Sequence, residues 1–138
     1  MEKGLNEIST AALAYLGDSV LEVAVRRMLV ERGLSSSRSL NKTALSYVTA
    51  PAQAAAVARI LPLLSEEETA VYHRGRNMGH SGVPKHATVA QYRMATGFEA
   101  LFGYLYLAGR QERLDELFLA AYGETENRKE ENNEQSQD

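Results

Sequence analysis

The chain has 138 residues, a formal net charge of −3 and no cysteine, with 44% apolar and 24% charged residues. This length favours one domain, and the composition is that of an ordinary globular protein with enough apolar residues for a core. The absence of cysteine excludes disulfides, thiolate nucleophiles and cysteine-type metal sites, and no apolar run approaches the roughly 20 residues of a membrane span. A cytoplasmic location is therefore the expectation.

The apolar periodicity predicts an all-α fold. The first helix, capped by Ser9 or Thr10 and ended by Gly33, is apolar around most of its circumference, as is typical of a helix in the middle of a bundle. The further helices are expected at 40–48, 51–62, 65–74, 88–107 and 109–122. Strand-like alternation is absent from the sequence.

One long connection interrupts this pattern. Residues 75–87 contain three glycines and a proline and break the helical periodicity, so they are predicted to form a loop. A structureless connection of about 13 residues inside a compact domain is usually functional.

Charged residues are distributed unevenly along the chain. Residues 124–138 carry six acids, two bases and no apolar side chain, which predicts a disordered acidic and polar tail after a domain at 1–123. Between Val23 and Phe98 ten Lys and Arg residues face four acids, so this stretch carries a charge of +6. A polyanionic partner is therefore compatible with the acidic chain as a whole.

Two acids stand in apolar helices. Asp18 interrupts the first helix, and Glu99 is the only charge between Ala95 and Gly109. A dry, unpaired carboxylate is costly, so each must face solvent, pair with arginine or hold a cation. For Asp18 a solvated stripe with Glu22 and an arginine four residues further on stays open; the helix of Glu99 offers no such cation.

Glycines beside these acids indicate close helix contact. Glycine inside a helix costs roughly 0.5–1 kcal/mol relative to alanine, so Gly17, Gly97 and Gly103 need a reason such as a tight crossing. Two carboxylates that meet across such a crossing form a hard-oxygen site suited to Mg²⁺. The sequence therefore predicts a candidate metal site at Asp18 and Glu99.

The predicted loop and its approach carry the residues that phosphate contact requires. Arg74, Arg76 and Lys85 are cations on a glycine-rich segment, and Asn77 can hydrogen-bond a sugar or cap the segment. These four residues are the candidate set for contact with a phosphate backbone, and a solvated loop without a partner is the alternative.

Three segments of the sequence resemble a known family. The segments YLGDSVLE (15–22) and FEALFGYLYL (98–107) resemble the two acidic motifs of the ribonuclease III family. The segment RGRNMGHSGVPKHATVAQYR (74–93) is similar to the distinctive loop of Mini-ribonuclease III, the short branch without a double-stranded-RNA-binding domain. The resemblance extends over residues 11–119.

The resemblance implies an all-helical, homodimeric endonuclease that cuts double-stranded RNA with Mg²⁺. With RNA as the polyanion, the candidate RNA-binding residues are Arg74, Arg76, Asn77 and Lys85, and recognition of the A-form duplex by shape and backbone contacts is expected. It implies 5′-phosphate and 3′-hydroxyl ends, precursor large-subunit (23S) ribosomal RNA as the substrate, and catalytic metal-binding roles for Asp18 and Glu99. Ala14 and Thr96 stand where full-length relatives have further acids, which implies a smaller carboxylate set.

Two other functions are compatible with the sequence. One is a non-catalytic helical module that binds double-stranded RNA, which predicts salt-sensitive binding without a Mg²⁺-dependent product. The other is a helical interaction domain, which predicts no binding of duplex RNA even at low salt.

Overall fold

The structure, a computed structural model, describes residues 4–79 and 85–136, the last thirteen of these as backbone only. Over this part of the chain the fold is all-α, as the sequence predicts, and contains no strand. The elements in chain order are η1 (Leu5–Glu7), α1 (Thr10–Glu31), α2 (Ser37–Val48), α3 (Ala50–Ile60), η2 (Leu61–Leu63), α4 (Glu66–Arg76), α5 (Val89–Leu107) and α6 (Gln111–Ser136).

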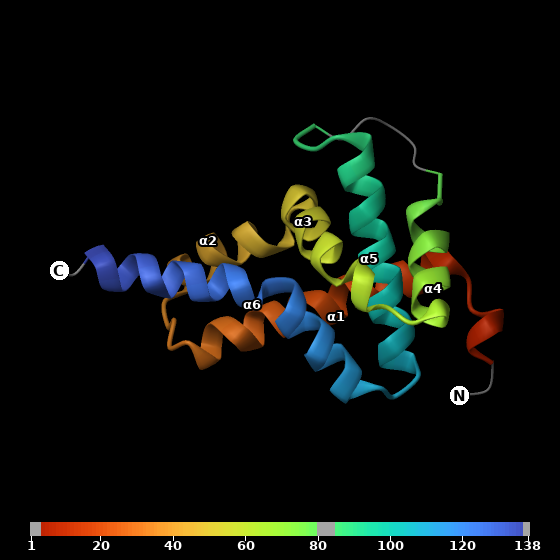
Figure 1. The fold of residues 1–138 in the computed structure, drawn as a ribbon, viewed down its shortest axis with the longest axis horizontal. Coiled ribbons are helices and arrows are strands. Elements are labelled where there is room, and N and C mark those ends of the chain that lie inside the picture. Colours follow the sequence, from red (N-terminus) through yellow and green to blue (C-terminus); the bar gives the residue numbers. More distant parts are fainter. Residues whose placement is uncertain (1–3, 80–84, 137–138) are drawn as a thin grey trace.

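Helix α5 is the centre of the bundle and packs against α1, α3, α4 and α6 (Figure 1). Every residue from Ala95 to Leu105 is buried except Glu99, which is half-buried. A helix surrounded by others is apolar on all sides. The sequence favours the first helix for this central place, and that is wrong, because α1 leaves Tyr15 and Val23 exposed.

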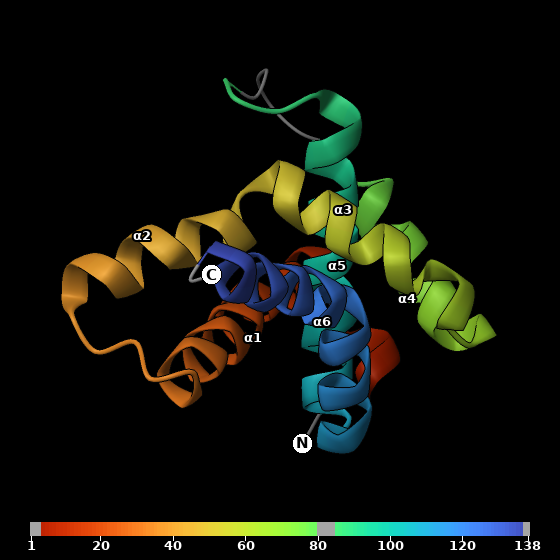
Figure 2. The ribbon, with the colours of Figure 1, turned by 60° about the vertical axis from the view of Figure 1, so that its left-hand side comes forward.

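The helix ends follow the predicted capping chemistry. The Ser9 hydroxyl accepts a hydrogen bond from Ala12 N at 3.1 Å, and Gly33 ends α1 with φ of 90°. After this turn α2 folds back along α1 (Figure 2). Capping boxes open α4 at Ser65 and α5 at Thr88.

Helix α4 ends later than the sequence predicts. It continues through Gly75 to Arg76, so the first residues of the predicted 75–87 loop are helical. The reason is tertiary, because Gly75 is buried against α5 and the packing offsets the weak helix propensity of glycine. Residues 80–84 of that predicted loop lie outside the described residues.

Helix α6 extends to Ser136, whereas the composition of residues 124–138 predicts a disordered tail. The division into a domain at 1–123 and a tail stays a prediction. None of the helices described is long and apolar enough to cross a bilayer.

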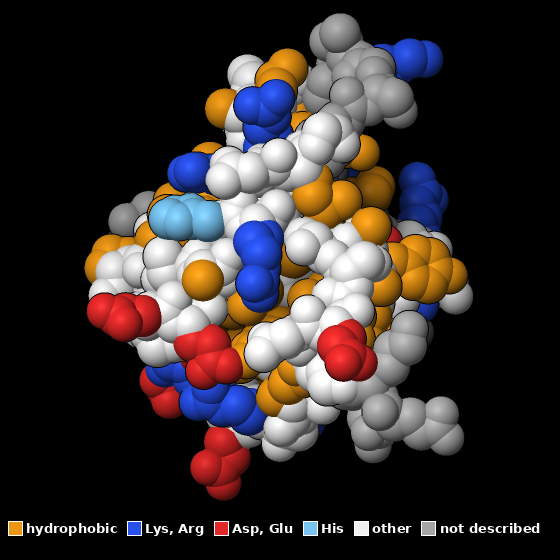
Figure 3. Space-filling model, turned by 90° about the vertical axis from the view of Figure 1, so that its right-hand side faces the viewer, with side chains coloured by type: hydrophobic (Ala, Val, Ile, Leu, Met, Phe, Trp, Pro, Cys, Tyr) orange, Lys and Arg blue, Asp and Glu red, His pale blue; other side chains and the backbone are white. Residues whose placement is uncertain are grey.

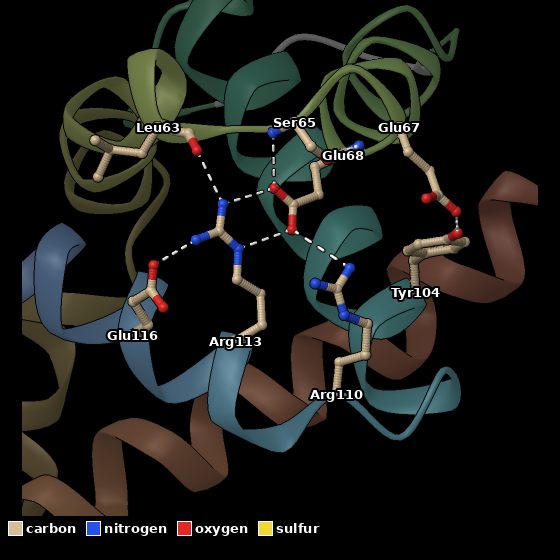
Figure 4. Close-up of polar contacts among 8 residues, drawn as sticks. All are labelled: Leu63, Ser65, Glu67, Glu68, Tyr104, Arg110, Arg113 and Glu116. Atoms are coloured by element: carbon tan, nitrogen blue, oxygen red, sulfur yellow. Dashed lines mark hydrogen bonds and ion pairs between the residues drawn. The ribbon is translucent and has the colours of Figure 1, made fainter.

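A buried ion pair joins the start of α4 to the start of α6 (Figure 4). Arg113 donates from Nε to Glu68 Oε2 at 2.9 Å and from Nη2 to Oε1 at 2.8 Å, and Nη2 also donates to Leu63 O at 2.9 Å. The Ser65 backbone N–H donates to Glu68 Oε1 at 2.8 Å. These contacts, the arginine hydrogen bond foremost, lower the pKa of Glu68 to about 2. The pair fixes α4 against α6.

Candidate active site

Helices α1 and α5 cross with their backbones in direct contact. A Cβ placed on Gly17 would lie 1.6 Å from the carbonyl oxygen of Glu99, and one on Gly103 would lie 2.0 Å from the carbonyl oxygen of Leu13. Both distances are far inside van der Waals contact, so only glycine fits at either position. The predicted close contact at Gly17 and Gly103 is confirmed.

This crossing brings the two predicted carboxylates together. Asp18 follows Gly17 directly, and the backbone of Glu99 is what Gly17 touches. Asp18 is exposed, whereas Glu99 is half-buried on the otherwise buried part of α5. The two carboxyl groups, from separate helices and far apart in the sequence, interact by charge and by a hydrogen bond.

The pair is electrostatically unfavourable without a cation. Burial, followed by the charge of Asp18 and the hydrogen bond with it, raises the pKa of Glu99 to about 8. Among the side chains described, no Lys or Arg forms an ion pair with Asp18 or Glu99. At neutral pH Glu99 is therefore mostly protonated.

The donor set fits Mg²⁺. In the described part of the chain no group of three or more His, Asp or Glu side chains is placed to hold a metal ion, so the protein offers two carboxylates. Mg²⁺ usually keeps several waters and binds through one or two carboxylates together with substrate phosphates. Asp18 and Glu99 would hold the cation, and its other ligands would be water and phosphate oxygens.

Two polar side chains one turn away from the pair have hydrogen-bond partners of their own. Thr96, one turn before Glu99, is buried, and its hydroxyl donates to the carbonyl oxygen of Tyr92 at 3.1 Å. Glu22, one turn after Asp18, accepts a bond from Arg26 at 3.4 Å. The solvated charge stripe that the sequence allowed for Asp18 is thus present as the pair of Glu22 and Arg26. Asp18 lies one turn before this pair.

The predicted RNA-binding residues lie at the end of α4 and just before α5. Arg74 and Arg76 are exposed on the last turn of α4 and not on a loop, and Asn77 is the C-cap of that helix. Arg76 Nε donates to Asn77 Oδ1 at 3.4 Å. Lys85 is exposed beyond residues 80–84. Helical placement fixes the backbone of the two arginines more firmly than the predicted loop would.

The surface around α4 is polarised by charge. Seen from the side of the bundle that carries α4, Lys and Arg lie mainly on the upper part of the face and Asp and Glu mainly on the lower part (Figure 3). The upper part is the end of the bundle where α4 ends and α5 begins (Figure 1). This end therefore presents positive charge to a polyanion.

The comparison with known sequences identifies the family. A sequence model described as the ribonuclease III domain matches residues 11–110. The chain belongs to the ribonuclease III family. The family consists of endoribonucleases, hydrolases of phosphodiester bonds, so the predicted enzyme class is confirmed.

Similar proteins support the membership over most of the chain. A Mini-ribonuclease 3 of Symbiobacterium thermophilum is 52% identical over 79% of this chain and 84% of the relative. A Mini-ribonuclease 3 of Thermoanaerobacter sp. is 47% identical over 82% of this chain and 80% of the relative. These matches confirm the predicted resemblance to the short branch.

A solved structure has the same fold. The X-ray crystal structure of protein FN1578 from Fusobacterium nucleatum superposes with a TM-score of 0.76 at 29% sequence identity, over 84% of this chain and 94% of that one. The predicted fold of the ribonuclease III family is confirmed.

One residue of this ribonuclease III family site was not anticipated from the sequence. Gly75, between Arg74 and Arg76, is buried against α5, and a Cβ there would lie 2.8 Å from both Gly97 Cα and Ala100 Cβ. The sequence assigned Gly75 to a loop, where glycine needs no contact to explain it. The spacing carries a signal, since position 75 lies four residues after Val71 and three after Tyr72, which is the same face of a helix.

Proposed function

We propose that this chain is a Mg²⁺-dependent endoribonuclease specific for double-stranded RNA, with Asp18 and Glu99 as its catalytic metal ligands. One observation carries the proposal: the glycine crossing of α1 and α5 holds two carboxylates together, and no described cation pairs with either. A site with this excess of negative charge favours a divalent cation. Membership in the ribonuclease III family supports the same assignment.

The chemistry follows from where these groups lie. When bound, Mg²⁺ activates water and neutralises the charge that builds up on the phosphoryl group. Glu99 gives up its proton on binding, because an adjacent cation lowers the pKa that burial and Asp18 raise. Asp18, being exposed, presents its carboxylate to the duplex side of the site. The proposed products carry a 5′-phosphate and a 3′-hydroxyl.

Substrate binding is assigned to the basic end of the bundle. Arg74, Arg76 and Lys85 are exposed cations that neutralise backbone phosphates, and Asn77 lies among them as a hydrogen-bonding group. Each neutralised phosphate adds about −0.9 to the slope of log affinity against log salt for a B-form duplex. We expect binding that is insensitive to base sequence and strongly weakened by salt.

The active form is proposed to be a homodimer in which each subunit supplies one carboxylate pair, so that both strands are cut. Large exposed apolar side chains on α1 and α5 support an interface: Tyr15 is 85% exposed, Val23 66% and Tyr106 51%. Val23 and Tyr106 line one hollow between α1, α5 and α6. Light scattering combined with an activity assay tests this, and an active monomer contradicts it.

The substrate is proposed to be precursor large-subunit (23S) ribosomal RNA in the cytoplasm, which the resemblance of residues 74–93 to the Mini-ribonuclease III loop supports. Cutting of a transcribed precursor stem is compared with cutting of an unrelated duplex of equal length. Preferential cutting of the precursor at one position is expected. Equal rates on both duplexes count against this substrate.

The central experiment uses Asp18→Asn, which keeps the size of the side chain and removes its charge. End-labelled duplex RNA is incubated with and without Mg²⁺, and a gel shift is run beside the cleavage assay. The variant is expected to bind RNA and not to cut it. Glu31→Gln is the matched control, because Glu31 is an exposed acid on the same helix, paired with Arg27 and away from Glu99.

The same assay separates the alternatives. Unchanged turnover by Asp18→Asn contradicts the assignment of the metal site. Salt-sensitive binding by the wild type without any Mg²⁺-dependent product indicates the non-catalytic RNA-binding module. Absence of a shift even at low salt indicates a helical interaction domain.

A further inference from the structure

The turn of α5 that carries Glu99 is held on two sides by glycines. On one side Gly17 of α1 contacts the carbonyl group of Glu99. On the other side Gly75 of α4 contacts Gly97 and Ala100, and its Cβ would also lie 3.0 Å from the carbonyl oxygen of Thr96. Both contacts are backbone against backbone or against a methyl group, so no flexible side chain separates the three helices there.

Gly75 of α4 lies between two arginines that are candidates for binding phosphate. Arg74 and Arg76 flank Gly75 and are exposed, whereas Gly75 is buried. The contact of Gly75 with residues 96–100 is the packing contact nearest to both arginines, so it fixes their backbone relative to Glu99. The contact has a second half, because a Cβ on Gly97 would lie 2.7 Å from the ring of Tyr72 and 2.8 Å from its carbonyl oxygen.

We propose that Gly75 is a positioning residue that sets the distance between the phosphate-binding end of α4 and the Asp18–Glu99 pair, and so selects which phosphodiester of a bound duplex is cut. The inference rests on the proposed function and adds to it a fixed spacing between the phosphate-binding residues and the metal ligands. In an A-form duplex the phosphates are regularly spaced, so cations at a fixed distance from the metal ligands define one scissile bond. Gly75 does this without touching RNA or metal.

The first test is Gly75→Ala. The added methyl group must move α4 away from α5, because the atoms it meets are backbone and a short side chain. The arginines are long enough to keep their phosphates, so the dissociation constant for RNA is expected to stay within about threefold. The kcat is expected to fall about tenfold to a hundredfold, since a displacement of about 1 Å is enough for such a loss. Mapped products are expected to include cuts at neighbouring bonds.

Two further variants control this result. Gly4→Ala lies outside the 74–93 segment, at a position where a Cβ meets nothing within 4 Å, and it is expected to cut like the wild type. Ala100→Gly combined with Gly75→Ala removes one of the two 2.8 Å contacts and is expected to restore part of the kcat. A role limited to stability would lower the melting temperature and leave kcat and product positions unchanged below it.

A measurement on the wild type keeps the proposal testable if Gly75→Ala does not fold. Duplexes that carry one neutral methylphosphonate at successive positions are assayed for cutting. A fixed distance between the arginines and the metal ligands predicts that a methylphosphonate inhibits cutting strongly at one constant offset from the scissile bond. Arg74→Ala or Arg76→Ala is expected to abolish this position-specific inhibition.

Inhibition spread evenly along the duplex would overturn the proposal, as would a Gly75→Ala enzyme with wild-type kcat and product positions. A Gly75→Ala enzyme that only binds RNA more weakly, with kcat unchanged, would overturn it too. Failure of the proposed function itself is recognised separately, because it appears as unchanged cutting by Asp18→Asn.

Discussion

Two glutamates of this small bundle are wholly or partly removed from solvent and have opposite kinds of partner. Glu68 is 1% exposed, accepts two hydrogen bonds from Arg113 and one from a backbone N–H, and its pKa is lowered to about 2. Glu99 is half-buried, faces Asp18, and its pKa is raised to about 8. In the first region the protein supplies the counter-charge, and in the second it supplies another acid.

This difference in counter-charge is the one expected between a structural site and the proposed metal site. A buried carboxylate with its own guanidinium is complete and needs nothing from solution. A buried carboxylate beside a second one lowers stability until a cation arrives, and such costs persist in proteins mainly at functional sites. The comparison predicts that the same substitution has opposite effects in the two regions.

The largest effect is expected for Glu99→Gln. Loss of one of the two proposed ligands removes several kcal/mol of charge stabilisation, which corresponds to a fall in kcat of roughly a thousandfold or more. The folded pKa of Glu99 lies above its unfolded value near 4.5, so the wild type loses stability as the pH rises from 4.5 to 8. The variant is expected to be more stable than the wild type at pH 7, by up to about 3 kcal/mol.

The measurements are a cleavage assay and urea unfolding in the absence of divalent cations. A Glu99→Gln protein that cuts at the wild-type rate, or that unfolds more easily than the wild type at pH 7, contradicts this interpretation of the site.

The second effect, Glu68→Gln, acts on stability instead of activity. Removal of one partner of a buried ion pair costs up to about 3–5 kcal/mol. The loss is expected in the lower part of this range, because Arg113 is 18% exposed and keeps its contacts with Glu116 and with Leu63 O. Cutting per folded molecule is expected to be unchanged below the melting temperature. Glu116→Gln is the control, since Glu116 contacts the same Arg113 but is 68% exposed, and it is expected to cost at most about 1 kcal/mol.

The pH dependence of Glu68 has the opposite sign to that of Glu99. Its folded pKa lies below the unfolded value near 4.5, so its contribution is complete above pH 4.5 and is lost as the pH falls toward 2. The stability difference between wild type and Glu68→Gln is therefore expected to shrink in acid. A difference that stays constant from pH 5 to pH 2.5 contradicts the assignment.

The third effect concerns cation binding. Because Glu99 is mostly protonated below pH 8, Mg²⁺ must displace its proton, and the affinity is expected to rise about tenfold per pH unit up to about pH 8. Calorimetry in buffers of different ionisation enthalpy measures the released proton directly. Release of about one proton per ion at pH 6.5 and almost none above pH 9 is expected. An affinity that does not depend on pH contradicts the raised pKa.

The two regions also differ in how far the sequence predicts them. Glu99 stands out as a single charge in an apolar helix, and Gly17 and Gly103 carry a visible propensity cost, so the convergence of Asp18 and Glu99 can be inferred before the fold is known. The pairing of Glu68 with Arg113 cannot be inferred from the sequence. Both residues stand among other charged residues, where exposure is the default, and they are 45 positions apart.

The end of α4 shows the limit of local propensity. Gly75 between two arginines favours a loop by its intrinsic preference, yet the structure continues the helix, because the position is buried where only glycine fits against α5. The prediction of Mg²⁺ and of the substrate class rests on the resemblance of three motifs, since two carboxylates alone do not distinguish Mg²⁺ from other hard cations.

The smallest effect is expected for Glu31→Gln, which asks whether pairing or burial distinguishes Glu68. Glu31 accepts a hydrogen bond from Arg27 at 2.9 Å, as close as the contacts of Glu68, but the two side chains are 63% and 68% exposed. Water and salt screen such a pair, and holding two long side chains costs entropy. The melting temperature is therefore expected to change by less than about 2 °C, at low and at high salt alike. A fall as large as that of Glu68→Gln would mean that pairing alone stabilises, and the contrast between the two glutamates would then rest on the guanidinium and not on its burial.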